Sequence, residues 1–149
     1  SKRITSFVMG SVPRNLIATF SGSPASYQAE AALLAGAGTK TETVNAGYSG
    51  SSYVNFPATG GSLTFNNANG GDGGLRTLRV RYALGGAATR TGQLVLNGVV
   101  SNIVFAPTAS WTSWTVLEIP LTLTAGNTNT IEFKSTGTDL ANIDEMTVR

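Results

Sequence analysis

Apolar and polar residues alternate along several stretches of this chain, and the alternation has a period of two. In Thr77–Tyr82 every second residue is apolar, and the residues between them are threonine and arginine. Thr128–Lys134 alternates in the same way, with Asn129, Ile131 and Phe133 on one face. Because successive side chains of a strand point to opposite faces, this pattern predicts half-buried β-strands. Further stretches with strand composition are Tyr27–Ala31, Ser52–Phe56, Ser62–Phe65, Gln93–Asn97, Val99–Phe105, Trp111–Ile119 (ended by Pro120) and Leu140–Val148.

Turn signals separate these stretches, and helical signals are nearly absent. Asn97-Gly98 is a preferred two-residue hairpin turn between two of the strands. Only Glu30–Ala37 has a composition that suits a helical turn. Eight or nine short strands without a convincing helix predict an all-β fold, specifically an antiparallel β-sandwich.

The first 25 residues differ in composition from the rest. They contain Lys2, Arg3 and Arg14 but no acidic residue, and they include two prolines. We therefore predict a linker or accessory segment at residues 1–25, whose short apolar patches have the composition of an added strand, followed by one domain at residues 26–149. A chain of 149 residues is long enough for one well-packed core.

The composition excludes several function classes. The chain has no Cys and no His, which excludes disulfides, thiolate zinc sites and the commonest general base. The stretch Gly47–Ser51 nearly matches the nucleophile elbow of a serine hydrolase, but Ser51 replaces its last glycine. A glycosidase needs two facing carboxylates, and adjacent Asp144 and Glu145 are expected to face opposite sides of a strand. The sequence therefore favours a binding module over an enzyme.

Charge and hydropathy also limit the partners. Charged residues make up 12% of the chain and the formal net charge is +2, which argues against nucleic acid as the partner. Arg79 and Arg81 are expected on a solvated sheet face, and the glycine-rich run Asn69–Gly74 is expected to be a flexible hairpin loop. No apolar run approaches the length that spans a bilayer, so no membrane partner is expected.

Oxygen-bearing side chains gather in three segments. Gln28 and Glu30 are expected on one face of the first strand, and Asn142 and Asp144 on one face of the last. Pairing of these two strands would bring them together near the Gly/Ser loop at 47–52. Ca²⁺ prefers six to eight such oxygen ligands. Simple solvent exposure of Gln28 and Glu30 explains their spacing equally well.

The same segments carry a resemblance to a known family. They appear in a fixed order along the chain: Tyr27–Glu30, Ala46–Val54, Leu78–Ala83, Leu96–Gly98, Trp111–Trp114 and Asn142–Asp144. This ordered set resembles a carbohydrate-binding module of family 35, which is close to family 6. The resemblance covers about Ser26 to Arg149.

The resemblance implies a fold, a metal and a setting. The fold would be a β-sandwich of jelly-roll type. A structural calcium ion would be held by Gln28, Glu30, Asp144 and a carbonyl near Ser51. The module would be non-catalytic and monomeric, and it would belong to a secreted glycoside hydrolase that degrades plant cell walls, for instance a mannanase, with the catalytic domain in the same parent chain.

The resemblance also implies a sugar site among the loops at one end of the sandwich. Tyr53, Trp111 and Asn142 match the family's binding positions, and Arg90 is the best match for its basic residue. Flat aromatic rings suit the apolar face of a sugar, and an amide both donates and accepts hydrogen bonds. Each of these residues also has a purely structural interpretation, either as a core residue or as a solvated charge.

Two other aromatic residues leave the assignment open. Trp114 follows Trp111 by three residues, so the two would face opposite sides of a strand, and we assign Trp114 to the core. Tyr48 takes the place of Tyr53 if the loop folds differently.

Family 35 contains members that bind neutral sugars and members that bind uronic acids. Members that bind uronic acids resemble one another in using an arginine and a second calcium ion. Glu42, Asp72 and Asp139 are the acids expected in loops, and they are scattered along the sequence. This scarcity favours neutral ligands, with β-mannan or a mannan-type hemicellulose first, whereas Arg90 supports uronic acids in xylan or pectin. A structural or adhesive sandwich domain is the remaining alternative.

Overall fold

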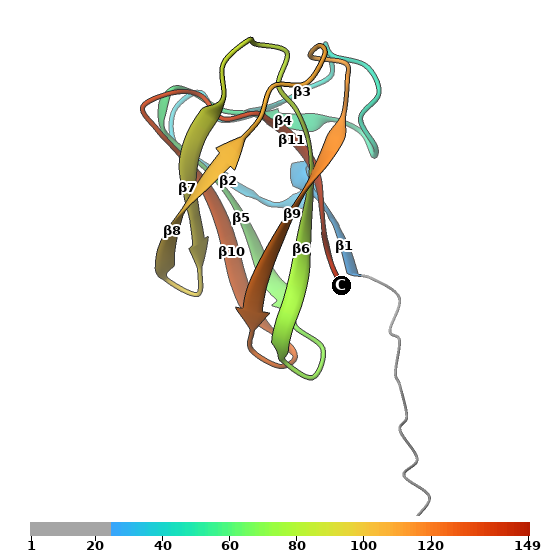
Figure 1. The fold of residues 1–149 in the computed structure, drawn as a ribbon, viewed down its shortest axis with the longest axis vertical. Helices are drawn as coiled ribbons and strands as arrows, with labels where there is room; N and C mark the ends of the chain where they lie inside the picture. Colours follow the sequence, from blue (N-terminus) through green and yellow to red (C-terminus); the bar gives the residue numbers. More distant parts are fainter. Residues whose placement is uncertain (1–24) are drawn as a thin grey trace, which may run out of the picture.

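The computed structural model describes residues 25–149, which form two antiparallel β-sheets packed face to face (Figure 1). This confirms the predicted all-β sandwich. The linker predicted for residues 1–25 lies outside the described residues, apart from Ala25, which begins the first strand. Within residues 25–149, no helix is long and apolar enough to cross a membrane.

The first sheet contains the strands that carry most of the chemistry. Its spatial order is β3 (Lys40–Glu42), β4 (Tyr53–Asn55), β11 (Asn142–Val148), β6 (Gly74–Ala83) and β9 (Thr115–Leu123), with β1 (Ala25–Gln28) also paired to β11. The first and last strands are therefore neighbours, as the sequence predicts. Their register places Gln28 opposite Glu145.

The second sheet covers the other face of the core. Its spatial order is β2 (Leu33–Ala35), β5 (Thr59–Asn69), β10 (Asn127–Thr136), β7 (Arg90–Leu96) and β8 (Val99–Phe105). The hairpin between β7 and β8 turns at Asn97-Gly98, where both residues have positive φ, as a type I′ turn requires. The run Asn69–Gly74 connects β5 to β6 and so joins the two sheets, whereas the sequence suggested a hairpin loop within one sheet.

The core lies between the sheets and follows the predicted alternation. Leu78 and Val80 of β6 are completely buried, as are Ile131 and Phe133 of β10. Arg79 of β6 faces outward and forms an ion pair with Glu118. The period-two pattern therefore identified the buried face of both strands correctly.

Four local predictions need correction. Strand β1 ends at Gln28, and a short 3₁₀ turn, η1 (Ala29–Ala31), follows because Ala29 turns into the core. Gln28 and Glu30 therefore do not share a strand face. The helical turn predicted over residues 30–37 is reduced to η1, and β2 follows it.

The strand predicted at Trp111–Ile119 begins later, at Thr115, and continues through Pro120 to Leu123. Proline is tolerated there because, among the described strands, β9 pairs only with β6 and lies at the edge of the sheet, so the missing N–H can face away from the ladder. As a result both tryptophans lie in the loop that precedes β9.

In β11 the register shifts between Ile143 and Glu145, which indicates a β-bulge. The bulge changes the direction of the side chains, so neighbouring Asp144 and Glu145 both reach the hydroxyl of Ser49, at 3.1 and 3.2 Å. The expectation that they face opposite sides of the strand is therefore wrong.

Candidate functional site

Four loops meet at one end of the sandwich. They span residues 43–52, 84–89, 106–114 and 137–141, and they connect strands whose ends lie together in the upper part of Figure 1. The register explains this meeting, because Ala83 pairs with Asn142 and Tyr82 pairs with Thr115. The candidate site residues all lie on or beside these loops, apart from those on β1 and η1.

Trp111 and Arg90 lie against each other on this loop end. The guanidinium carbon of Arg90 lies 5.1 Å from the centre of the Trp111 ring, within cation–π distance. Trp111 packs against the core with part of its surface and leaves the rest exposed. A partly exposed indole on a loop end is an arrangement that suits binding of a flat, partly apolar ligand.

Glycine at position 85 allows this arrangement. A Cβ atom at Gly85 would lie 2.4 Å from the backbone nitrogen of Trp111 and 2.5 Å from its ring. The two loops 84–89 and 106–114 therefore pack against each other without a side chain between them. Thr108 strengthens the contact, because it donates its backbone N–H to the carbonyl of Leu84.

The other two predicted sugar contacts differ in how much surface they present. Asn142 lies beside this cluster at the start of β11, but it is only 3% exposed. Tyr53 has no exposed surface, and its hydroxyl is held by Asn45 and Glu42. The prediction that Tyr53 presents a stacking face therefore needs correction, because the rings of Tyr48 and Trp114 lie against its ring.

The assignment of Trp114 to the core also needs correction. Its indole is partly exposed and packs against the loop at 43–52, donating its N–H to the carbonyl of Ala46 at 2.9 Å. Its ring centre lies 5.4 Å from that of Tyr53, and Tyr48, which is partly exposed, lies 5.8 Å from Tyr53. Trp111, not Trp114, is the tryptophan that packs against the core cluster.

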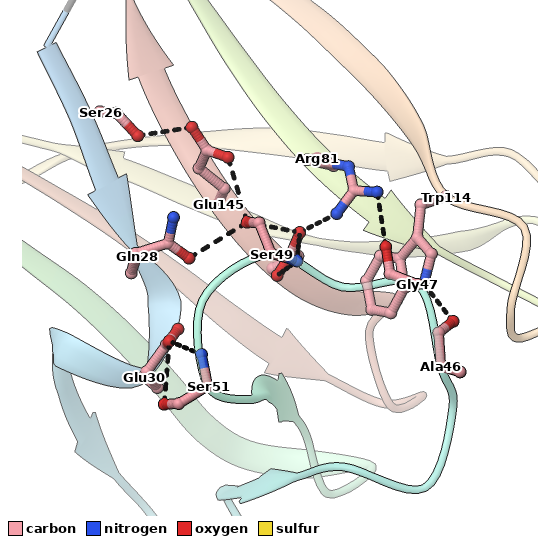
Figure 2. Close-up of polar contacts among 11 residues, drawn as sticks. Ser26, Gln28, Glu30, Ala46, Gly47, Ser49, Ser51, Arg81, Trp114 and Glu145 are labelled. Atoms are coloured by element: carbon pink, nitrogen blue, oxygen red, sulfur yellow. Dashed lines mark hydrogen bonds and ion pairs between the residues drawn. The ribbon is translucent and has the colours of Figure 1, made fainter.

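The predicted metal ligands gather around the turn at residues 49–51 (Figure 2). Gly50 lies directly against two of them, because a Cβ there would be 2.3 Å from Oε1 of Glu30 and 2.7 Å from Oε1 of Gln28. Its φ of +66° also favours glycine. The missing side chain thus leaves room in which the two oxygens converge.

Glu30 is held in this cradle as a carboxylate. Its Oε1 accepts hydrogen bonds from the backbone N–H and the hydroxyl of Ser51, at 2.7 and 3.1 Å. Burial alone would raise the pKa of Glu30, but these hydrogen bonds outweigh it and the pKa lies below its ordinary value. Its Oε2 is buried and has no hydrogen-bond partner among residues 25–149. A buried carboxylate oxygen without a partner is costly unless a cation lies beside it.

Asp144 contacts Ser49 of the same turn and is fully buried. It accepts hydrogen bonds from the N–H and hydroxyl of Ser49, and it forms an ion pair with Arg81. Arg81 also donates to the carbonyl of Gly47 at 2.7 Å and lies over the ring of Trp114. The negative charge of Asp144 is therefore already balanced by a residue that the sequence placed on a solvated face.

The donor set fits a hard cation in its chemistry. Across residues 25–149, no three side chains of the His, Cys, Asp and Glu types come together as a metal-binding group. A cation at Gly50 would therefore depend on Glu30, the amide oxygen of Gln28 and backbone carbonyls, which are oxygen ligands of the kind that Ca²⁺ accepts.

Sequence reasoning brought the correct segments together but missed four residues of these two clusters. Ser49, Arg81 and Asp139 contact the predicted site residues Asp144 and Arg90, and Glu145 joins the cluster by accepting from the Ser49 hydroxyl. Arg81 gave no signal, since an arginine on the polar face of a strand usually points to solvent. Asp139 was noted only as a loop acid, and its partner was not identified.

Taken together, the antiparallel sandwich and the cluster on its loop end define a β-sandwich binding module. The family described as "Carbohydrate binding module (family 6)" matches residues 28–149, and the chain belongs to that family.

Solved structures give the same fold. A family 35 carbohydrate-binding module from Clostridium thermocellum has a TM-score of 0.77 and 36% identity, over 85% of this chain and 97% of that one. A family 35 module from Paenibacillus barcinonensis has a TM-score of 0.77 and 34% identity, over 84% and 98% of the two chains. These matches support the family 35 resemblance and the non-catalytic character of the domain.

Curated relatives place such modules within much longer chains. Endo-1,4-beta-xylanase B of Cellvibrio japonicus is 34% identical over 106 residues, which are 68% of this chain and 18% of the relative. Exo-beta-D-glucosaminidase of Amycolatopsis orientalis is 31% identical over 128 residues, which are 84% of this chain and 12% of the relative. The chain therefore spans less than a fifth of the length of these relatives.

Proposed function

We propose that this domain is a non-catalytic module that directs an appended, secreted glycoside hydrolase to plant cell-wall polysaccharide. The observation that carries the proposal is the partly exposed Trp111 on the loop end, fixed by Gly85 and flanked by Arg90. The enzyme names of the relatives support attachment to a carbohydrate-active enzyme. We propose that the module acts as a monomer, since this one exposed loop end is enough to bind a polysaccharide.

We propose β-mannan, or a mannan-type hemicellulose, as the preferred polysaccharide. Mannose units carry no charge, and the loop end offers an aromatic face together with the hydrogen-bonding groups of Arg90 and Asn142. Trp111 would stack on a sugar ring, and Arg90 and Asn142 would contact its hydroxyl groups. Uronic acids in xylan or pectin are the competing ligands, because Arg90 is a natural partner for a carboxylate.

Calorimetric titration of mannan oligosaccharides into the protein tests this function. We expect heat of binding and a change in tryptophan fluorescence, and we expect Trp111→Ala to abolish both while the protein stays folded. Leu75→Ala is the control, since Leu75 is exposed at the opposite end of β6. Binding that survives Trp111→Ala would move the site elsewhere, and heat with uronic acids alone would establish the competing specificity.

We also propose that Ca²⁺ binds at Gly50 and stabilises the fold, with Gln28 and Glu30 as side-chain ligands and a backbone carbonyl of the turn near Ser51. Asp144, which the resemblance also implies as a ligand, is paired with Arg81 instead. The partnerless Oε2 of Glu30 and the space at Gly50 support this ion. A ligand that binds only the folded state raises the melting temperature. Calcium is therefore expected to raise it, and a chelator is expected to lower it.

A pair of glycine variants separates the ion from the backbone. Gly50→Ala places a methyl group where the two oxygens converge, whereas Gly60→Ala has a similar φ of +73° but meets nothing within 4 Å. In both variants, backbone strain should lower the free energy of unfolding by about 1 kcal/mol. Only Gly50→Ala should also lose the stabilisation by calcium. An equal calcium response in the two variants would contradict the assignment.

A further inference from the structure

Arg90 is already paired with a carboxylate of this chain. Its Nη1 lies 2.6 Å from Oδ2 of Asp139, and the same nitrogen donates to the carbonyl of Leu140 at 3.2 Å. The Arg90 side chain is 19% exposed and that of Asp139 is 42% exposed, so the pair lies at the edge of the loop end. Trp111 lies on the guanidinium at the same time.

The position of Asp139 is set by its neighbours in the loop. Leu140 and Ala141, which follow it, are completely buried. Leu140 packs against Gly92 of β7, where a Cβ would lie 2.3 Å from the leucine side chain. Gly92 is two residues from Arg90 along β7, so the same packing that buries Leu140 brings Asp139 to the guanidinium.

This pairing determines what Arg90 offers to a ligand. Nη1 is engaged by the ion pair with Asp139 and by the hydrogen bond to the Leu140 carbonyl, so one nitrogen of the fork is occupied. A ligand carboxylate would compete with Asp139 for the guanidinium and would lie close to its negative charge. The hydroxyl of a neutral sugar needs only one free N–H and adds no charge, and Nη2 lies towards Gly86, at 3.8 Å from where a Cβ would stand.

We propose that Asp139 is a specificity-determining residue, whose carboxylate takes the place of a ligand carboxylate on Arg90 and so selects uncharged sugars over uronic acids at the loop end. The inference rests on the proposed carbohydrate-binding function and deepens it. Asp139 acts through Arg90, and its contribution is to the choice of ligand and not to the strength of sugar binding as such.

The test compares two ligands and three proteins. Mannotetraose and glucuronic acid are titrated into the wild type, Asp139→Asn and Asp72→Asn, with calcium present. Asp72→Asn changes the charge equally but lies in the turn before β6, at the other end of that strand. We expect Asp139→Asn to raise the affinity for glucuronic acid by about tenfold, since a like charge beside the ligand is removed. Affinity for mannotetraose should change less than about threefold.

Salt dependence provides a second readout. The affinity for glucuronic acid that Asp139→Asn gains should be lost as the salt concentration is raised, because that affinity depends on an exposed charge pair. Adding Arg90→Ala to Asp139→Asn should also abolish the gain. Asp72→Asn should behave as the wild type with both ligands.

The outcomes separate the two proposals. If the wild type binds mannotetraose and Asp139→Asn gains no affinity for glucuronic acid, the role of Asp139 is overturned while the carbohydrate-binding function stands. A wild type that already prefers glucuronic acid overturns the role of Asp139 as well, because its carboxylate then fails to exclude the anion. A wild type that binds neither sugar, nor any other soluble polysaccharide fragment, overturns both proposals.

Discussion

Gly85→Ala tests the packing that fixes Trp111 at the loop end. Both Gly85 and its neighbour Gly86 have backbone conformations that alanine adopts without strain. Their surroundings differ, because a Cβ at Gly85 would lie 2.4 Å from the backbone nitrogen of Trp111, whereas a Cβ at Gly86 would meet only Arg90, at an ordinary 3.8 Å. Gly86→Ala is therefore a matched control.

The expected cost follows from these distances. The backbone of Trp111 must move by about 1 Å to reach an ordinary contact of 3.4 Å. Because the neighbouring atom is backbone and not a flexible side-chain end, this overpacking should cost about 1–3 kcal/mol. For a domain of this size that corresponds to a fall in melting temperature of about 4 °C per kcal/mol. Gly86→Ala should be neutral, or stabilising by a few tenths of a kcal/mol.

Thermal unfolding, tryptophan fluorescence and sugar titration together check this prediction. Gly85→Ala should lower the melting temperature, shift the emission of Trp111 and weaken mannan oligosaccharide binding by at least about tenfold, or 1.4 kcal/mol. A Gly85→Ala protein that melts, fluoresces and binds as Gly86→Ala does would refute the packing of the two loops described above.

Two further predictions concern the ionic groups of the first sheet. Arg81→Met leaves the fully buried carboxylate of Asp144 without its charge partner, so chemical denaturation should show a loss of about 3 kcal/mol in the free energy of unfolding. Arg79→Met breaks an exposed pair and should lower it by less than about 1 kcal/mol. Equal losses in the two variants would contradict the burial of Asp144. The folded-state pKa of Glu30 is lowered against its burial by hydrogen bonds, chiefly from Ser51, so its contribution to stability is present above the ordinary carboxyl pKa of 4.5 and is lost as the pH falls through the folded-state value. With a chelator present, the melting temperature should therefore fall on acidification below about pH 4.5, and Glu30→Gln should flatten that dependence; an unchanged slope would argue against the carboxylate described here.

The fold was largely predictable because its information is local. Alternation in Thr77–Tyr82 and Thr128–Lys134 identified the buried faces. Asn97-Gly98 identified the hairpin, since these two residues readily adopt the positive φ values of a type I′ turn. The short strands β2 and β3 were not predicted, because three residues carry too little periodicity to recognise. The segments of the site were predicted through the resemblance, in the order in which they occur along the chain.

The exposure and partners of the site residues were not predictable in this way. Tyr53 is buried and Trp114 is partly exposed, the reverse of what the sequence suggested. The burial of Tyr53 depends on how the loop at 43–52 packs against the loop before β9. The bulge in β11 has no sequence signal, yet it decides that Asp144 and Glu145 reach the same hydroxyl.

The sequence by itself determined that this chain is an all-β binding module without thiol or imidazole chemistry, because composition and period-two patterning depend on neighbouring residues alone. The tertiary structure decided which charged side chains are paired with each other. Arg81 is opposite Asp144, and Arg90 is opposite Asp139, although 63 and 49 positions of sequence separate the partners. Such pairs form only when strands from distant parts of the chain end at the same place, and Coulomb attraction over a few ångströms then fixes what the loop end can bind.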